Sequence, residues 1–255
     1  MRIVLKIGGN EIDDQSFLDK VSKLVAGIHK DGHKVVLVHG GGKEITNLLT
    51  RLGIGTRFVK GFRYTDLQSL EAVEMMLSGL INKRLVRALQ QNGVHAIGLS
   101  GIDGKILIAE RTTREGEDIG FVGEVQTVNA AALEELMQKF VVVLSPISAN
   151  EDLTGSLNVN ADYAAAAVAS SLKSELAIFL SNVQGVLNDG RVMPELNEKE
   201  FMSLKQSGIV TGGMVPKIEA ALRALNGGTK KAFIVDAEGA SKIVSGQPAG
   251  THVTG

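Results

Sequence analysis

The sequence predicts an α/β protein with a mostly parallel β-sheet that is covered by helices. Short apolar runs rich in β-branched residues alternate with segments whose apolar residues recur at helical spacing. Parallel strands need long crossover connections, which helices usually supply, so this alternation favours a parallel sheet. With 255 residues, of which 44% are hydrophobic and 22% charged, the chain can bury a sizeable core.

The first predicted unit is a strand, a helix and a second strand. Residues 2–7 form an apolar run that ends at Gly8 and Gly9, and residues 34–39 form another that ends at three more glycines. Between the two runs, apolar residues recur at helical spacing until an Asp-Gly turn. We therefore expect two neighbouring strands that both end in glycine-rich loops.

The next part of the chain predicts a helix, a hairpin and a long helix. Helical spacing follows the three glycines as far as residue 52, and residues 57–65 alternate around a glycine as a hairpin would. Residues 67–89 keep apolar side chains at helical spacing throughout, which predicts one long helix.

The same alternation continues to the end of the chain. The predicted strands are 94–99, 141–144, 176–180 and 232–235, the predicted hairpin joins 106–110 to 121–126, and the predicted helices are 130–139, 162–172, 198–207 and 215–225. No Pro/Gly/Ser-rich linker interrupts the pattern, so any lobes must be fused. We expect the seam near Lys173, where an alanine-rich helix is followed by a new strand, and it would divide residues 1–173 from residues 174–255.

Composition excludes several classes of function. The 27 basic and 28 acidic residues nearly cancel, so no net field attracts nucleic acid or an anionic membrane, and any anion must be bound by a local arrangement. The absence of cysteine excludes disulfides and thiolate centres and fits a reducing compartment. The chain begins directly with a strand-like run and has no apolar stretch of roughly 18 residues. We therefore expect a cytoplasmic protein without a membrane partner.

Two strand ends carry candidate anion sites. Lys6 stands just before the first glycine pair, and ligands of open α/β sheets bind beyond the carboxyl ends of the strands. Gly40, Gly41 and Gly42 would direct backbone N–H groups and a helix N-terminus at one point. Residue 45 is Ile45 and no G-x-x-x-x-G-K-[ST] pattern occurs, which weakens the dinucleotide and P-loop interpretations. The alternatives are a surface lysine and plain tight turns.

Two further candidate sites stand at predicted helix starts. Asn158, Asn160 and Asp162 alternate, so extended backbone would point all three the same way, although Asp162 could instead simply cap the helix. Pro216 suits a first helical turn, and Lys217 follows a second glycine pair. This resembles the Lys6 arrangement, and the alternative is an ordinary helix start.

Eight strings, in order and at compatible spacing, resemble the amino acid kinase family: KIGGN, VHGGGKEI, GFRYTD, GLSGIDG, GFVGEV, NVNADYAAA, LSNVQGVL and GIVTGGMVPKIEAAL. The resemblance implies an open α/β/α sandwich around an eight-stranded, mostly parallel sheet. It also implies that lobe 1–173 binds the amino-acid substrate and dimerises, and that lobe 174–255 binds ATP. The strings are most similar to members that phosphorylate the γ-carboxylate of N-acetyl-L-glutamate in arginine biosynthesis.

The resemblance assigns a role to each site residue. The catalytic residues would be Lys6, Lys217 and Asp162; the substrate-binding residues Gly41, Gly42, Arg63, Asn158 and Asn160; and the ATP-binding residues Gly8, Gly9, Ser181, Asn182, Gly185, Gly212, Gly213 and Met214. Many relatives have aspartate where this chain has Asn182, which puts the nucleotide contact at that position in doubt. The resemblance also implies Mg²⁺, held mainly by the ATP phosphates, and no metal-ligating residue.

The chemistry agrees with these roles. A carboxylate substrate is already ionised at pH 7, so no general base is needed to make the nucleophile. Bringing that anion against a triphosphate requires positioning and positive charge, which two lysines and glycine N–H groups supply.

Two other functions and one assembly prediction follow from the same strings. INKRLV, GLSGIDG and LSNV also fit kinases whose aminoadipate or glutamate substrate is attached to a carrier protein, whereas GFRYTD and LNVNAD favour the free acid. A non-catalytic amino-acid sensor of the same fold is the third possibility. The long helix, with Met75, Met76 and Leu80, could offer one face to a twofold partner. The resemblance also implies that arginine-inhibited hexamers carry an N-terminal helical extension that links dimers, whereas here the first strand begins at about Arg2. We therefore expect a homodimer that arginine does not inhibit.

Overall fold

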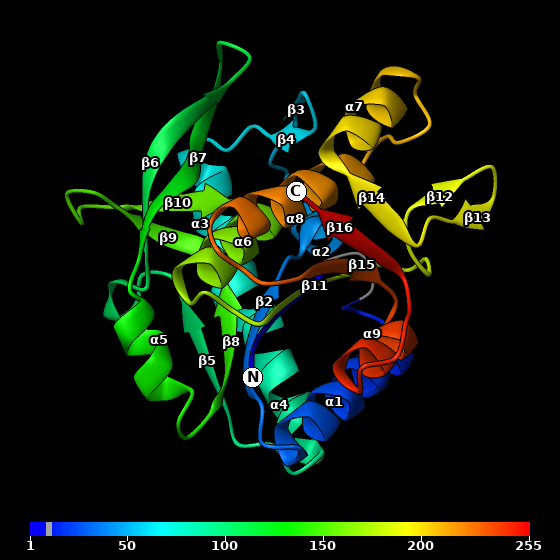
Figure 1. Cartoon of the computed structure of the whole chain (residues 1–255). Helices are drawn as coiled ribbons and strands as arrows, with labels where there is room; N and C mark the ends of the chain where they lie inside the picture. The colour runs from blue at the N-terminus through cyan, green and yellow to red at the C-terminus, as the bar shows by residue number, and fades with distance from the viewer. Residues whose placement is uncertain (9–11) are drawn as a thin grey trace.

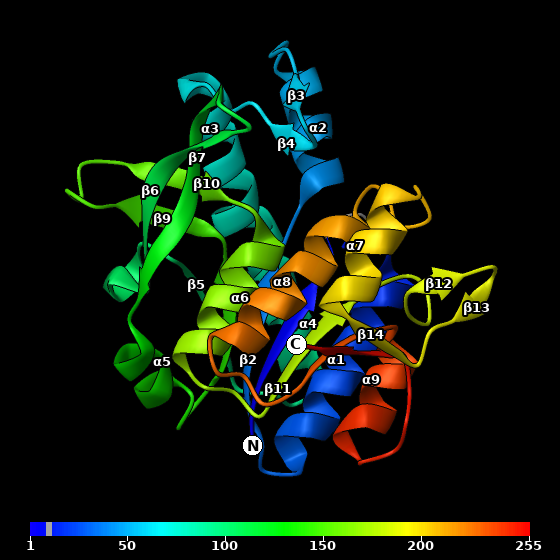
Figure 2. The same cartoon turned by 45° about the horizontal axis from the view of Figure 1, so that its top comes forward.

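The computed structural model describes residues 1–8 and 12–255 and shows an eight-stranded sheet between two layers of helices (Figures 1 and 2). The strand order is β14-β16-β15-β11-β1-β2-β8-β5. Six strands are parallel, and β16 and β14 run the opposite way at one edge. The strands are β1 (Arg2–Ile7), β2 (Lys34–His39), β5 (Ala96–Ser100), β8 (Val141–Ser145), β11 (Leu176–Leu180), β14 (Glu195–Asn197), β15 (Ala232–Val235) and β16 (Thr251–Thr254). The predicted mostly parallel sheet is confirmed.

Each face of the sheet has its own helices and its own apolar core. One face is covered by α1 (Gln15–Lys30), α2 (Gly42–Arg51), the long helix and α9 (Ala237–Val244). The other is covered by α5 (Ala130–Leu136), α6 (Ala161–Ser171), α7 (Glu198–Gln206) and α8 (Met214–Asn226). Because strand side chains alternate, Ile3 and Leu5 of β1 belong to the first core and Val4 to the second. Lys6 therefore points to the side of α6 and α8.

The long helix is confirmed but is not uniform. It runs through α3 (Leu67–Glu74), a π-helical segment η1 (Met75–Ile81) and α4 (Asn82–Gln91). Met76 is buried, whereas Met75 is 60% exposed, so only one of the paired methionines can serve an outer face.

A smaller β-structure stands beside the helices of the second face. Four strands, β6 (Leu107–Arg114), β7 (Glu117–Val128), β9 (Ile147–Asn150) and β10 (Ser156–Val159), close into a small barrel from which the β6–β7 hairpin extends. A second hairpin joins β3 (Phe58–Val59) to β4 (Phe62–Arg63), as predicted. Several elements were not predicted from the sequence: β9, β10, α9, β14, β16, the 3₁₀ turn η2 (Asp103–Lys105) and the hairpin of β12 (Leu187–Asn188) and β13 (Arg191–Val192).

The main sheet runs without a break across the predicted seam. Lys173, with a left-handed φ of 44°, ends the turn after α6, and β11 then pairs directly with β1. The division into lobes at residue 173 stays a prediction. No helix in residues 1–8 and 12–255 combines the length and apolarity that a bilayer span requires.

Candidate active site

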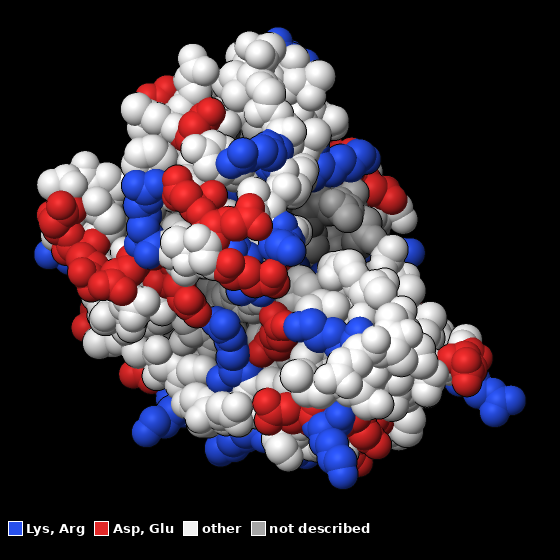
Figure 3. Space-filling view, turned by 90° about the horizontal axis from the view of Figure 1, so that it is seen from above, with Lys and Arg blue, Asp and Glu red and all other residues white. Residues whose placement is uncertain are grey.

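A cavity of about 550 Å³ opens where β1, β2 and β11 end and where α2, α6 and α8 begin. This is the carboxyl edge of the sheet, where open α/β folds bind ligands. Around the hollow on this face, basic and acidic side chains are mixed (Figure 3), in keeping with a formal net charge of −1. The lining residues include Lys6, Gly8, Gly40, Gly41, Gly42, Arg63, Asn158, Asn160, Asp162, Ser181, Asn182, Gly213, Met214, Pro216 and Lys217.

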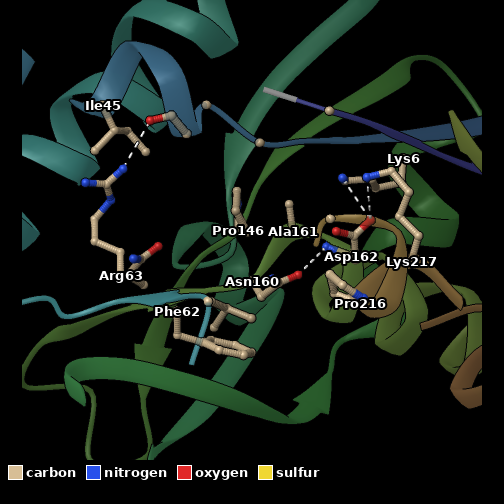
Figure 4. A pocket seen from close by; sticks show the side chains of 18 of the residues that line it. Lys6, Ile45, Phe62, Arg63, Pro146, Asn160, Ala161, Asp162, Pro216 and Lys217 are labelled. Atoms are coloured by element: carbon tan, nitrogen blue, oxygen red, sulfur yellow. Dashed lines mark hydrogen bonds and ion pairs between the residues drawn. The ribbon is translucent and has the colours of Figure 1, made fainter. Parts of the chain in front are cut away.

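One end of the cavity holds two lysines and an aspartate (Figure 4). Asp162 Oδ1 lies 2.8 Å from Lys6 Nζ and 3.9 Å from Lys217 Nζ. Lys6 is 4% exposed and Asp162 is 6% exposed, so little water screens their charges. The Lys6 contact is an ion pair without hydrogen-bond alignment, which means that charge holds it. This arrangement brings two ammonium groups together at one point.

Asn160, rather than Asp162, caps helix α6. Its Oδ1 accepts the backbone N–H groups of Asp162 at 2.8 Å and of Tyr163 at 3.3 Å. The alternative in which Asp162 serves only as the cap is therefore wrong, because a neighbour performs that task. The Asp162 carboxylate remains available to hold the two lysines.

The opposite end of the cavity holds Arg63 (Figure 4). Its Nη2 donates to Thr46 Oγ1 at 2.8 Å and to the Gly42 carbonyl at 3.1 Å, and the guanidinium lies over the Phe58 ring. Burial lowers the pKa of Arg63 below its usual value, which marks the guanidinium as partly desolvated. Its Nη1 is buried and meets no hydrogen-bond partner within residues 1–8 and 12–255. A buried donor without a partner is costly, so this atom fits an anionic ligand.

Asn158 is hydrogen-bonded to the segment that follows the strand of Arg63. Its Nδ2 donates to Thr65 Oγ1 at 3.2 Å, and that hydroxyl donates to the Arg63 carbonyl at 3.1 Å. Asn158 therefore lines the cavity and also fixes the backbone that carries the arginine.

The triple-glycine loop, Gly40 to Gly42, lines the cavity between its lysine end and its arginine end. A Cβ on Gly41 would lie 2.4 Å from Ile81 Cδ1 and 2.8 Å from Leu77 Cδ2, so only glycine lets this loop pack on η1. α2 starts at Gly42 without a side-chain cap, which leaves its first N–H groups for a ligand. Burial lowers the pKa of His39, just before the loop, to about 4, so this histidine is neutral at pH 7.

Five of the eight predicted nucleotide residues line the cavity, whereas Gly185 and Gly212 are not among its lining residues. Gly9 lies outside the described residues. A Cβ on Gly185 would come within 2.7 Å of Thr251 Oγ1, which gives Gly185 a packing role against β16. Gly212 has a left-handed φ of 56° and forms the turn before α8. A role in nucleotide binding stays a prediction for all three.

Sequence reasoning missed the apolar wall of the cavity. Its members are Ile45, Phe58, Phe62, Leu77, Val122, Pro146 and Leu180. They come from six separate segments of the chain, and none carries a local signal beyond ordinary core periodicity. Only the pairing of the β3–β4 hairpin, which sets Phe58 opposite Arg63, could have pointed to one of them.

The fold and the site together indicate the class of protein to which the chain belongs. A parallel sheet whose glycine-rich strand ends face paired lysines is an arrangement for handling phosphate. The profile of the amino acid kinase family matches residues 1–236, and the chain belongs to that family.

The chain is also similar to individual members of the family and to solved structures. The chain is 44% identical to the acetylglutamate kinase of Methanopyrus kandleri, over 92% of this chain and 95% of that protein. It is 42% identical to the acetylglutamate kinase of Roseiflexus castenholzii, over 93% of this chain and 90% of that protein. Among solved structures, smu.665 of Streptococcus mutans superimposes with a TM-score of 0.85 at 28% identity and covers 99% of this chain and 98% of that one.

Proposed function

We propose that this chain transfers the γ-phosphoryl group of ATP to the γ-carboxylate of N-acetyl-L-glutamate, giving N-acetylglutamyl phosphate for arginine biosynthesis. The observation that carries the proposal is one cavity with two separate anion sites. At one end, two lysines lie at Asp162. At the other end lies Arg63 Nη1, which is buried and has no hydrogen-bond partner among the described residues. The near full-length relatives named acetylglutamate kinase support the same reaction. Because the reaction consumes ATP and the chain lacks cysteine, we assign it to the cytoplasm.

The site residues divide the work of the reaction. Arg63 would clamp the α-carboxylate, so that the ionised γ-carboxylate reaches toward Lys6 and Lys217. A carboxylate oxygen bonds to the γ-phosphorus while the bond from phosphorus to the ADP oxygen breaks, and no proton has to move. The lysines stabilise the charge on the transferring group, and Asp162 keeps them together.

ATP would bring Mg²⁺ with it. Within the described part of the chain, no group of three histidine, aspartate or glutamate side chains could hold a metal ion. Asp162 is the single carboxylate among the described residues of the cavity lining, and the lysines already occupy it. A donor set of this kind fits a magnesium ion held mainly by phosphates and water.

The proposed function is tested by turnover on free substrates. We expect ATP-dependent formation of an acyl phosphate, trapped as the hydroxamate with hydroxylamine, from N-acetyl-L-glutamate. Its one-carbon-longer homologue should give a lower kcat/KM, because the distance between the two anion sites is fixed. The absence of turnover on both free acids, or a preference for the longer one, would overturn the proposal and favour a carrier-bound substrate or a sensor.

Arg63→Lys should raise the KM for N-acetyl-L-glutamate by about 10- to 100-fold and leave the KM for ATP nearly unchanged. A planar fork that can hold a carboxylate with two bonds is replaced by a point charge, at the end of the cavity away from the phosphates. Steady-state kinetics with each substrate varied in turn measure both constants. Arg57→Lys, whose guanidinium lies over the Tyr64 ring, is the matched control. An unchanged KM for the amino acid would remove Arg63 from the site.

We also propose a homodimer built on the long helix. Leu67, Met75 and Leu80 are 59%, 60% and 47% exposed on α3 and η1, which gives this helix an uncovered apolar face. Light scattering should give the mass of a dimer for the parent chain and of a monomer for a Met75→Glu, Leu80→Glu variant. Met202→Glu changes a similarly exposed methionine on α7 and should stay dimeric. A monomeric parent would contradict the proposal.

A further inference from the structure

Near the lysine end of the cavity, a hydrogen bond joins helices α6 and α8, and the proposed reaction does not use it. Tyr163 follows Asp162 on α6, and Glu219 lies two residues after Lys217 on α8. The Tyr163 hydroxyl donates to Glu219 Oε2 at 2.6 Å. The bond therefore joins the two helix starts that present Asp162 and Lys217 to the cavity.

Glu219 contacts side chains from three separate elements, α6, α7 and β6. Its Oε1 accepts from Lys205 Nζ of α7 at 2.8 Å, and Arg114 of β6 lies 3.9 Å from Oε2. Burial by itself would raise the pKa of Glu219, but Lys205, Tyr163 and Arg114 outweigh burial and lower the pKa below its usual value. The carboxylate is therefore ionised at neutral pH and can hold all of these donors at once.

The Tyr163 ring extends the same network to the substrate end of the cavity. It stacks on Phe62, with ring centroids 6.1 Å apart, and Phe62 lines the cavity next to Arg63. Arg114 lies 4.4 Å from the Phe62 centroid, so one arginine contacts both Phe62 and Glu219. Phe62, Tyr163 and Glu219 thus form a chain of contacts between the arginine end and the lysine end.

Few long side chains join α6 to α8. Their facing parts are rich in buried alanine, so the two helices pack closely through short side chains. At the other end of the helix pair, a Cβ on Gly227 would meet Ser170 Oγ at 2.2 Å, so close approach holds that end. At the cavity end, the longer side chains of Tyr163 and Glu219 join the two helices.

We infer that Tyr163 and Glu219 are positioning residues that set the distance of Lys217 from Asp162 and align both with Arg63. The inference rests on the proposed function. Tyr163 and Glu219 are not proposed to contact the substrate, and they would act through the starts of helices α6 and α8. A displacement of about 1 Å between reacting groups can lower turnover by about 100-fold, so a bond of this kind has a kinetic effect larger than its effect on stability.

The experiment is a double-mutant cycle on kcat. Tyr163→Phe keeps the ring stack and removes the hydroxyl, and Glu219→Leu removes its acceptor. We expect each to lower kcat by about 10- to 100-fold with small changes in either KM, and the double variant to be no slower than the slower single variant. Glu219→Gln, which still accepts a hydrogen bond, should recover much of the Glu219→Leu loss.

Two matched controls separate positioning from general damage. Tyr64→Phe removes the hydroxyl of the other tyrosine, for which the described residues offer no hydrogen bond, and should keep the parental kcat. Glu238→Gln weakens an exposed pair with Lys242 on α9 and should do the same.

The outcomes distinguish this inference from the proposed function. An active parent whose Tyr163→Phe variant keeps kcat within about twofold, or whose double variant shows the product of the two single losses, overturns the inference alone. Losses confined to the melting temperature, with kcat unchanged, also overturn it. A parent without turnover on N-acetyl-L-glutamate overturns the proposed function and this inference with it.

Discussion

Lys217→Ala and Lys6→Ala should each lower kcat by about 100- to 1,000-fold while the KM values for both substrates change little. Both ammonium groups lie at Asp162, where the proposed reaction would place the transferring phosphoryl group, and positive charge there would stabilise the transition state more than the bound substrates. Lys6→Arg should not restore turnover, because a planar guanidinium cannot replace a compact ammonium in a site that leaves Lys6 4% exposed.

Steady-state kinetics of the three variants test this expectation. Lys242→Ala, an exposed lysine on α9, is the control for loss of a positive charge and should behave like the parent. Equal losses of affinity with an intact kcat would show that the lysines only bind ATP, and the catalytic assignment would then be wrong.

Asp162→Asn should be harmful even though it barely changes the shape of the side chain. The contact with Lys6 depends on charge rather than on hydrogen-bond alignment, so the amide removes the negative charge that both ammonium groups face. Removing one partner of a buried pair costs about 3 kcal/mol or more, which corresponds to a melting temperature lower by roughly 10 °C. Turnover should fall by about 100-fold or more, because the lysines move apart.

Calorimetry with and without ATP distinguishes this cause from simple damage. A polyphosphate supplies the missing negative charge, so ATP should raise the melting temperature of Asp162→Asn more than that of the parent. Asp103→Asn, which removes a carboxylate that accepts from Ser100 away from the cavity lining, is the control. Equal stabilisation of parent and variant by ATP would contradict the role of Asp162 in holding the lysines.

The central strands could be predicted and the edges of the structure could not. β1, β2, β11 and β15 match their predicted bounds because buried parallel strands are continuous β-branched runs with glycine or polar ends. β9, β10 and β16 contain only four residues each. β9 and β10 pair with each other, but each also needs a partner far away in the sequence, β6 for β9 and β7 for β10. The π-helical turn at Met75–Ile81 has no counterpart in a 3.6-residue pattern, so the long helix was predicted as uniform.

In the same way, some residues of the candidate site could be predicted from the sequence and others could not. Lys6, Asp162 and Lys217 could be found because each stands at an element end beside glycine, asparagine or proline, and sequence shows such ends well. That Asn160 rather than Asp162 caps α6 depends on two hydrogen bonds that spacing alone cannot assign. Phe62, Tyr163 and Glu219 meet only through tertiary packing, and separately each resembles an ordinary core or surface residue.

The strand order sets when the residues at the lysine end of the cavity can first come together during synthesis. Lys6 lies on β1, which obtains its second neighbour only when β11 pairs Phe179 opposite Lys6. At ribosomal rates of about 5–20 residues per second, synthesis from Lys6 to Phe179 takes roughly 10 to 35 s, and Lys217 emerges later still. A nascent chain therefore holds Lys6 in a half-built sheet while the intervening segment is made, and the two lysines and Asp162 can meet only after α8 has followed β11.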